Sequence, residues 1–150
     1  MAKYSLDTNI YIDALRDPNE RAALRDFNSW ALPSTYLSAV VILELEAGAS
    51  APPQAQALDQ LFIAPFERRQ RVLIPSPVAW RSTGQAIATL RRTSGQAAPA
   101  FQLIHDILLA FSCREHGITL ITRDSDFRTV ARLVPGLRVT SPWPKRPRGA

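Results

Sequence analysis

Two acidic side chains lie in apolar segments where a solvated surface position does not account for them. Glu44 lies within Val40–Leu45, which is apolar on almost every side, and Asp106 has apolar residues three and four positions away along a predicted helix. A buried carboxylate is costly unless it is paired with a cation. We therefore take both acids as candidate functional residues. The ordinary alternatives are a narrow solvent-facing stripe for Glu44 and a salt bridge for Asp106.

Three further acids follow segments that are typical of short β-strands. Asp7 comes directly after Lys3–Leu6, and Asp124 and Asp126 come shortly after Ile118–Ile121. Each of the three is explained on its own as a helix cap, an interaction worth roughly 0.5–2 kcal/mol. In a parallel sheet, however, the carboxyl ends of the strands gather at one edge, where sites form. The acids are therefore expected to converge at that edge.

Converging carboxylates repel one another unless a cation holds them together. The chain has one cysteine and two histidines, so oxygen atoms must dominate any ligand set. Oxygen ligands select hard cations, here Mg²⁺ or alternatively Mn²⁺. Such ions promote the hydrolysis of phosphodiesters by activating water and stabilising the leaving oxygen. The single cysteine, Cys113, also excludes an intramolecular disulfide.

The segments that must position these acids alternate between strand-like and helix-like patterns. The 150 residues, 46% of them hydrophobic, suit one domain with a substantial core, in which we expect Trp30 and Trp80. Strands are predicted at Lys3–Leu6, Thr35–Leu37, Val72–Ile74, Ile118–Ile121 and Leu137–Thr140. Helices are predicted at Ile10–Leu15, Glu20–Trp30, Ala39–Ala49, Val78–Arg92, Leu103–His116 and 127–133, and in an amphipathic segment with Leu58, Leu61, Phe62 and Phe66; Ser94–Pro99 is predicted as a loop. The alternation predicts an α/β fold with a mainly parallel central β-sheet flanked by α-helices.

Positive charge is concentrated toward the end of the chain. The formal net charge is +5, and residues 111–150, with eight basic and three acidic side chains, carry all of it. A polyanionic partner such as nucleic acid would account for this asymmetry, and a soluble, arginine-rich surface is the alternative. No apolar run reaches the roughly 18 residues of a membrane span, and the N-terminus lacks a signal-peptide core. We therefore expect a cytoplasmic protein without a membrane partner.

The acids belong to an ordered series of short motifs. The motifs are Tyr4–Ile10, Ser38–Gly48, Asp106–Ala110, Glu115–Phe127 and Pro135–Val139. Their order and spacing resemble those of PIN-domain ribonucleases. The size of the chain and the form of its motifs resemble those of the VapC toxins of bacterial VapBC toxin–antitoxin pairs. The resemblance spans about residues 3–140. It implies a single PIN-like nuclease domain over residues 1–140, followed by a basic, Pro-rich tail over 141–150 that we expect to be mobile.

The resemblance also implies an activity and roles for individual residues. It implies a Mg²⁺-dependent endoribonuclease that is usually dimeric and is restrained by a cognate VapB-like antitoxin. Carried over by position, the catalytic acids are Asp7, Glu44, Asp106 and Asp124. The metal ligands are expected among Asp7, Asp106, Asp124 and Asp126, because the fourth acid could be either of the last two. Residues that would orient carboxylates or water are Thr8, Asn9, Ser38 and Thr122, and Arg123 is a hypothetical contact to RNA phosphate.

Other functions predict different sequence features. A non-catalytic RNA-binding or partner-binding α/β module would share the fold and the basic end, but it does not require the set of acids. A phosphatase-like phosphotransfer enzyme usually carries a second acid two residues after its nucleophilic Asp, and position 9 is Asn. A dinucleotide-binding protein would show Gly-x-Gly-x-x-Gly after Leu6, which is absent. The RNA target is left open by the sequence.

Overall fold

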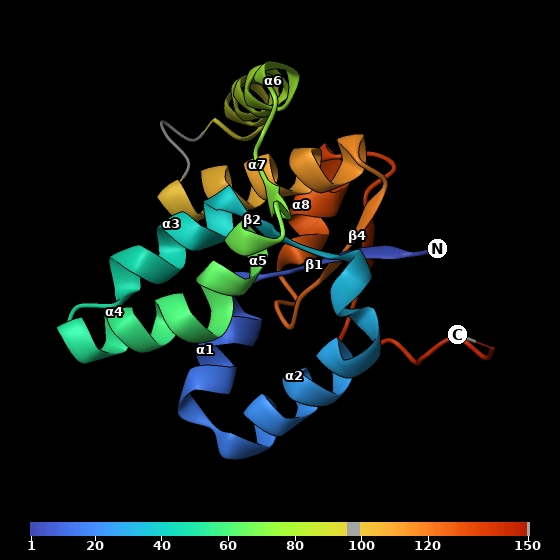
Figure 1. Cartoon of the computed structure of the whole chain (residues 1–150). Coiled ribbons are helices and arrows are strands. Elements are labelled where there is room, and N and C mark those ends of the chain that lie inside the picture. The colour runs from blue at the N-terminus through green and yellow to red at the C-terminus, as the bar shows by residue number, and fades with distance from the viewer. Residues whose placement is uncertain (96–99, 150) are drawn as a thin grey trace.

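A five-stranded parallel β-sheet forms the centre of the molecule (Figure 1). The computed structural model describes residues 1–95 and 100–149. The strands are β1 (Lys3–Leu6), β2 (Thr35–Ser38), β3 (Val72–Leu73), β4 (Ile118–Ile121) and β5 (Arg138–Thr140). Their order across the sheet is β3-β2-β1-β4-β5, and every paired neighbour runs parallel. The α/β fold with a mainly parallel sheet, predicted from the sequence, is therefore confirmed.

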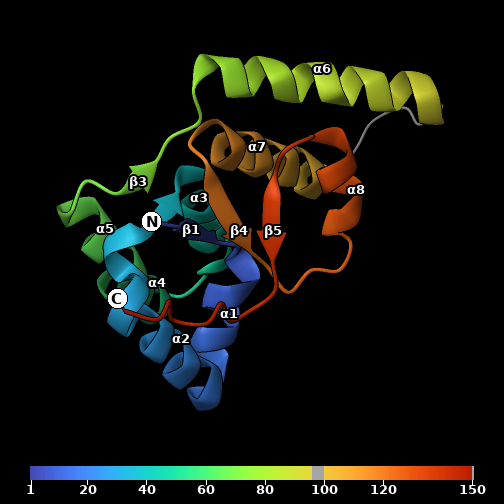
Figure 2. The same ribbon diagram turned by 90° about the vertical axis from the view of Figure 1, so that its right-hand side faces the viewer.

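Helices connect the strands and cover both faces of the sheet. They are α1 (Thr8–Arg16), α2 (Pro18–Ala31), α3 (Ala39–Gly48), α4 (Pro52–Leu58), α5 (Ala64–Arg68), α6 (Pro77–Ser94), α7 (Phe101–Glu115) and α8 (Phe127–Leu133). Figure 2 shows α1 and α2 on one side of the sheet and α7 on the other, with α6 lying outside α7. Because both faces are covered, the central strands β1, β2 and β4 are almost continuously buried, as in the pattern buried–intermediate–buried–buried of β4, whereas the edge strand β5 is largely exposed.

The order of the strands reverses at β1. This strand pairs with β2 on one side and with β4 on the other, and the register places Leu6 opposite Ile121. The chain moves outward from β1 to β3 and then returns to β4. Ligands of open parallel sheets bind at such a switch point, outside the carboxyl ends of the strands. The residues directly after Leu6 and Ile121 therefore stand at the position where this architecture places a site.

One predicted helix is divided by a proline. The segment expected as a single amphipathic helix consists of α4, a π-helical turn at Asp59–Ile63, and α5. Pro65 has no backbone N–H and its ring crowds the carbonyl four residues earlier, so the preceding turn widens. The Ala64 N–H bonds to the Asp59 carbonyl instead. Of the four apolar residues that defined the predicted helix, Leu61 is 54% exposed, whereas Leu58, Phe62 and Phe66 are buried.

Other differences from the sequence-based expectations lie at the surface. Trp80, expected in the core, is 58% exposed on α6, which contacts the rest of the fold mainly through α7. Residues 96–99 of the predicted loop Ser94–Pro99 lie outside the described residues. Trp143 packs against Phe27 of α2 with the ring centroids 5.0 Å apart, so the start of the tail is anchored. Within the described part of the chain, no helix has the length and apolar character to cross a membrane.

Candidate active site

Asp7 follows β1, and its side chain is hydrogen-bonded to Thr122, which follows β4. It caps the N-terminus of α1, where its Oδ1 accepts a hydrogen bond from the Thr8 backbone N–H at 2.8 Å. Its Oδ2 accepts a hydrogen bond from the Thr122 hydroxyl at 2.7 Å, and the Asn9 amide lies 3.3 Å from the same hydroxyl. The Asp7 side chain is buried. The capping role expected for Asp7 is therefore real, but it occupies only one of the two carboxylate oxygens.

The loop after β4 is organised by the same threonine. The Thr122 hydroxyl donates to Asp7 and accepts a hydrogen bond from the Asp124 backbone N–H at 3.0 Å. Asp124 Oδ1 accepts in turn from the Asp126 backbone N–H at 2.8 Å. Asp124 remains exposed to solvent, as does Asp126, which lies at the start of α8. Thr122 thus fixes the loop from which Asp124 reaches the site.

Glu44 of α3 and Asp106 of α7 are joined by Gln102. The Gln102 amide nitrogen donates hydrogen bonds to Glu44 Oε2 and to Asp106 Oδ1, each at 3.1 Å. Gln102 was missed by the sequence analysis, although its position four residues before Asp106 places it on the same helix face. Asp106 is buried, and Glu44 Oε1 is a buried oxygen without a hydrogen-bond partner among the described residues.

The acids of these elements share one electrostatic environment. Burial, together with the charges of Asp7, Glu44 and Asp124, raises the pKa of Asp106 to about 7, and the hydrogen bond from Gln102 opposes this shift. Burial likewise raises the pKa of Asp7, against the hydrogen bonds from Thr122 and Thr8, with Glu44 and Asp124 adding to the rise. The charges of Glu44 and Asp124 therefore act on both Asp7 and Asp106, which makes four of the five predicted acids. Asp126 is absent from both sets of interacting charges.

The remaining predicted residues lie around this cluster. Ser38 is buried and caps α3, its hydroxyl accepting from the Val40 N–H at 3.1 Å, so it fixes the start of the helix that carries Glu44. The Thr8 hydroxyl is buried and has no hydrogen-bond partner among the described residues. Thr8 contributes to the site instead through its backbone N–H, which donates a hydrogen bond to Asp7.

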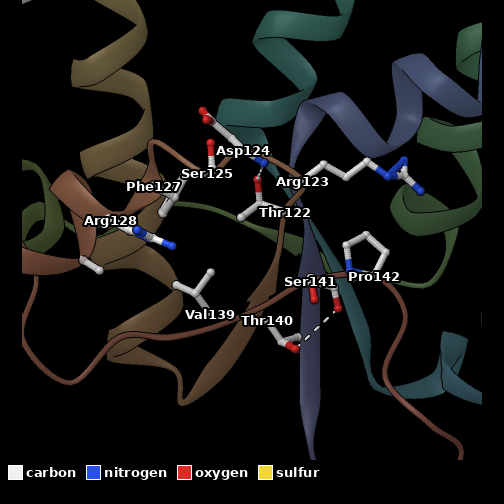
Figure 3. A pocket seen from close by; sticks show the side chains of 11 residues that line it. Thr122, Arg123, Asp124, Ser125, Phe127, Arg128, Val139, Thr140, Ser141 and Pro142 are labelled. Carbon is white, nitrogen blue, oxygen red and sulfur yellow. Dashed lines mark hydrogen bonds between the residues drawn. The ribbon is translucent and has the colours of Figure 1, made fainter.

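Arg123 makes ion pairs within the protein. Its guanidinium lies 2.8 Å from an Asp13 carboxylate oxygen and also pairs with Glu20. Figure 3 shows its side chain extending away from Asp124 and Ser125 of the same loop. Two acids therefore neutralise the arginine that the sequence analysis singled out as a hypothetical RNA contact, and it braces the loop against α1 and α2.

The arrangement is that of a known family. The family model of the PIN domain matches residues 4–133. The chain belongs to the PIN-domain family. PIN domains are generally nucleases, and the site at the β1–β4 switch point is the candidate active site of this PIN domain. The comparison with curated proteins finds no match.

Several solved structures resemble this PIN domain over nearly its whole length. A DNA-bound VapBC of Salmonella typhimurium is 26% identical, with a TM-score of 0.68 and coverage of 94% of this chain and 98% of that one. A FitAB bound to a DNA fragment is 22% identical, with a TM-score of 0.66 and coverage of 97% and 99%. FitAcB from Neisseria gonorrhoeae is 24% identical, with a TM-score of 0.65 and coverage of 93% and 98%. Of these three structures, the VapBC and the FitAB are bound to DNA.

The donor set of the PIN domain fits a hard cation. Within residues 1–95 and 100–149, no group of three or more His, Cys, Asp or Glu side chains is already arranged to hold a metal ion. The acids nevertheless offer only oxygen atoms, and Glu44 Oε1 is buried without a partner. A divalent cation would offset the mutual repulsion that contributes to the raised pKa of Asp106.

Proposed function

We propose that this PIN domain is an endoribonuclease that depends on Mg²⁺, or alternatively on Mn²⁺, and acts as the toxin of a toxin–antitoxin pair. The observation that carries the proposal is the convergence of Asp7, Glu44, Asp106 and Asp124 at one sheet edge, where their charges act on one another. Carboxylates forced together in this way are typical of sites that recruit a cation and phosphate. Asp124, and not Asp126, is the fourth acid in this proposal.

The residues of the chain divide the chemical work. Asp7, Asp106 and Asp124 would hold the cation, and Thr122 keeps the Asp7 carboxylate in a fixed orientation through its 2.7 Å hydrogen bond. When bound, the ion supplies Lewis acidity at the scissile phosphate and toward water. Glu44 Oε1 has free lone pairs and accepts the proton that the attacking water loses. The products carry 5′-phosphate and 3′-hydroxyl ends, and no covalent intermediate with the protein forms.

RNA, an antitoxin and a second copy of the chain are the proposed partners. RNA is supported by the resemblance of the motifs to PIN-domain ribonucleases and by the excess of positive charge in residues 111–150. A cognate antitoxin is supported by the structural neighbours, which are VapBC and FitAB complexes that this chain matches over more than nine tenths of its length. The homodimer is proposed from the resemblance to VapC toxins.

The test is cleavage of RNA by the purified protein, free of antitoxin. We expect cleavage with Mg²⁺, none with EDTA, and a loss of at least about a hundredfold in Asp7→Asn, since removing one metal-bound charge disables the site. Asp26→Asn is the matched control, because Asp26 is an exposed acid of α2 and is not among the charges that act on Asp7 or Asp106. Single-stranded DNA of equal length tests the preference for RNA.

Two outcomes would contradict the proposal. Cleavage that persists in EDTA and in Asp7→Asn would mean that the acids are not the catalytic centre. Tight RNA binding without cleavage, equal in the parent and in Asp7→Asn, would support the non-catalytic binding module instead.

A further inference from the structure

A cavity of about 660 Å³ adjoins the acid cluster on the side of β5. Figure 3 shows it between the loop that follows β4 and the chain that leaves β5. Its lining combines three kinds of surface, which are the charged Asp124 and Arg128, the apolar Phe127, Val139 and Pro142, and the polar Ser141. The volume lies within the roughly 300–1,000 Å³ range of small-molecule sites. Of this lining, only Asp124 and Thr122 have a role in the proposed hydrolysis.

Arg128 supplies the cavity with a positive charge that the protein does not neutralise. Its side chain is exposed and makes no ion pair with any residue of 1–95 or 100–149. Figure 3 shows its guanidinium directed into the space below the loop, toward Val139 and Thr122. Arg123, five residues earlier, forms ion pairs with two carboxylates. A free guanidinium beside a hydrolytic site suits a phosphate group, which it contacts through paired N–H donors.

The opposite wall offers what a nucleoside requires. Val139 of the edge strand β5 is 39% exposed, and Pro142 continues the apolar surface. The Ser141 hydroxyl makes no hydrogen bond to the described residues, so its donor and acceptor are free. A base can lie against the apolar wall while the hydroxyl meets its polar edge.

Asp124 connects the cavity to the proposed chemistry. It lines the rim of the cavity and also belongs to the acid cluster that acts on Asp106 and Asp7. A nucleotide in the cavity therefore stands next to a phosphate at the cluster. The Asp124 charge alone would repel that phosphate, and a cation at the acids together with Arg128 would reverse the sign of the local field.

We propose that this cavity is a nucleotide subsite that holds one nucleotide of the RNA beside the scissile phosphate. Its base lies against Val139 and Pro142, and Arg128 contacts a backbone phosphate. The subsite rests on the proposed nuclease function for its place in catalysis, but binding of a nucleotide can be measured without cleavage. Because this base contacts the side of the cavity formed by β5, the identity of the base helps to determine which RNA bonds are cut.

The first experiment measures binding of the four nucleoside 5′-monophosphates to the isotopically labelled whole chain by NMR, with Mg²⁺ present. We expect saturable shifts of the Val139 and Ser141 amides, with an affinity that falls about tenfold in Arg128→Ala. Arg132→Ala is the matched control, since Arg132 is exposed on the same helix and does not line the cavity. Shifts confined to other surfaces, or none at millimolar nucleotide, would overturn the subsite.

The second experiment uses RNA cleavage at several salt concentrations. Loss of one phosphate contact should raise KM and reduce the slope of log KM against log salt by about 0.7 in Arg128→Ala, with kcat changed far less. Arg132→Ala should keep the parent slope. Val139→Trp, which fills the cavity at an exposed position, should alter the base preference at one position of the cut site, and Val139→Thr should not.

The outcomes separate this subsite from the nuclease proposal. If the parent cleaves RNA and both Arg128→Ala and Val139→Trp match it in KM, salt slope and base preference, the subsite is wrong and the nuclease stands. If nucleotides bind at Val139 and Ser141 in an Arg128-dependent manner but RNA is never cut, the nuclease proposal fails and the nucleotide site remains.

Discussion

At the scale of single residues, hydrogen-bond donors hold a set of mutually repelling carboxylates in place. Asp7 receives the Thr8 N–H and the Thr122 hydroxyl, and Gln102 donates to two carboxylates at once. Hydrogen bonds of this kind favour the ionised form and oppose burial, which disfavours it. For Asp106 burial prevails, since its pKa rises to about 7. Without a bound metal, the Asp106 carboxyl is therefore only partly ionised at neutral pH.

The raised pKa makes stability depend on pH. An unfolded Asp titrates near 3.8 and folded Asp106 near 7, so the folded state binds the proton more tightly between these values. Its stabilising contribution is complete below about pH 4 and is lost as pH rises toward 7, with a slope of up to about 1.4 kcal/mol per pH unit. Asp106→Asn cannot ionise, so urea unfolding without metal should show it gaining stability relative to the parent as pH rises.

Asp26→Asn serves as the control for this titration, because Asp26 is an exposed acid of α2 and is not among the charges that act on Asp106. Its difference from the parent should stay flat over the same range. An Asp106→Asn difference that is equally flat from pH 4 to 8 would show that Asp106 does not carry the raised pKa.

At the scale of elements, the sequence predicted the features that depend on local residue patterns, namely the strands, the helices and the residues at the strand ends. The alternation of apolar strands with amphipathic helices places Asp7 and Thr122 at strand ends, and parallel pairing of β1 with β4 brings them together. Gln102 was not predictable in the same way, because its role depends on how close α3 lies to α7. The ion pairs of Arg123 likewise join segments more than one hundred residues apart.

Arg123 is best understood as a brace between elements. It ties the loop after β4 to Asp13 on α1 and Glu20 on α2. Because these ion pairs are partly exposed, Arg123→Gln should lower the free energy of unfolding by only about 1 kcal/mol or less. It should weaken Mg²⁺ binding several-fold by loosening Asp124, and it should leave the salt slope of KM for RNA at the parent value. Mg²⁺ titration and cleavage at several salt concentrations measure both effects.

The alternative for Arg123 is the RNA contact hypothesised from the sequence. In that case Arg123→Gln would lower the salt slope by about 0.7, as expected for Arg128→Ala, and would leave the affinity for Mg²⁺ unchanged. The two arginines thus act as controls for each other, since one is neutralised within the fold and the other is not.

At the scale of the whole molecule, the most basic part of the chain builds one side of the site. Residues 111–150 carry the entire net charge, and two parts of this stretch, the loop after β4 with the start of α8 and the chain around the end of β5, line the cavity next to the acids. Trp143 then fastens the start of the tail to Phe27 of α2. Arg128, the lining arginine that makes no ion pair with the described residues, therefore stands on the same cavity as Asp124 of the acid cluster. An unpaired arginine next to a proposed cation site suits a polyanion.

Binding of the cation should be visible in the stability of the whole fold. A ligand that binds only the folded state adds RT ln(1 + [L]/Kd), about 1.4 kcal/mol at ten times Kd, which raises the Tm of a 150-residue domain by about 3–6 °C. Thermal unfolding with Mg²⁺ or Mn²⁺, against NaCl of equal ionic strength, should show this rise in the parent and in Asp26→Asn but not in Asp106→Asn. Cleavage of RNA without any such rise, at metal concentrations that support full activity, would mean that the ion enters with the substrate and that the acids alone do not form its site.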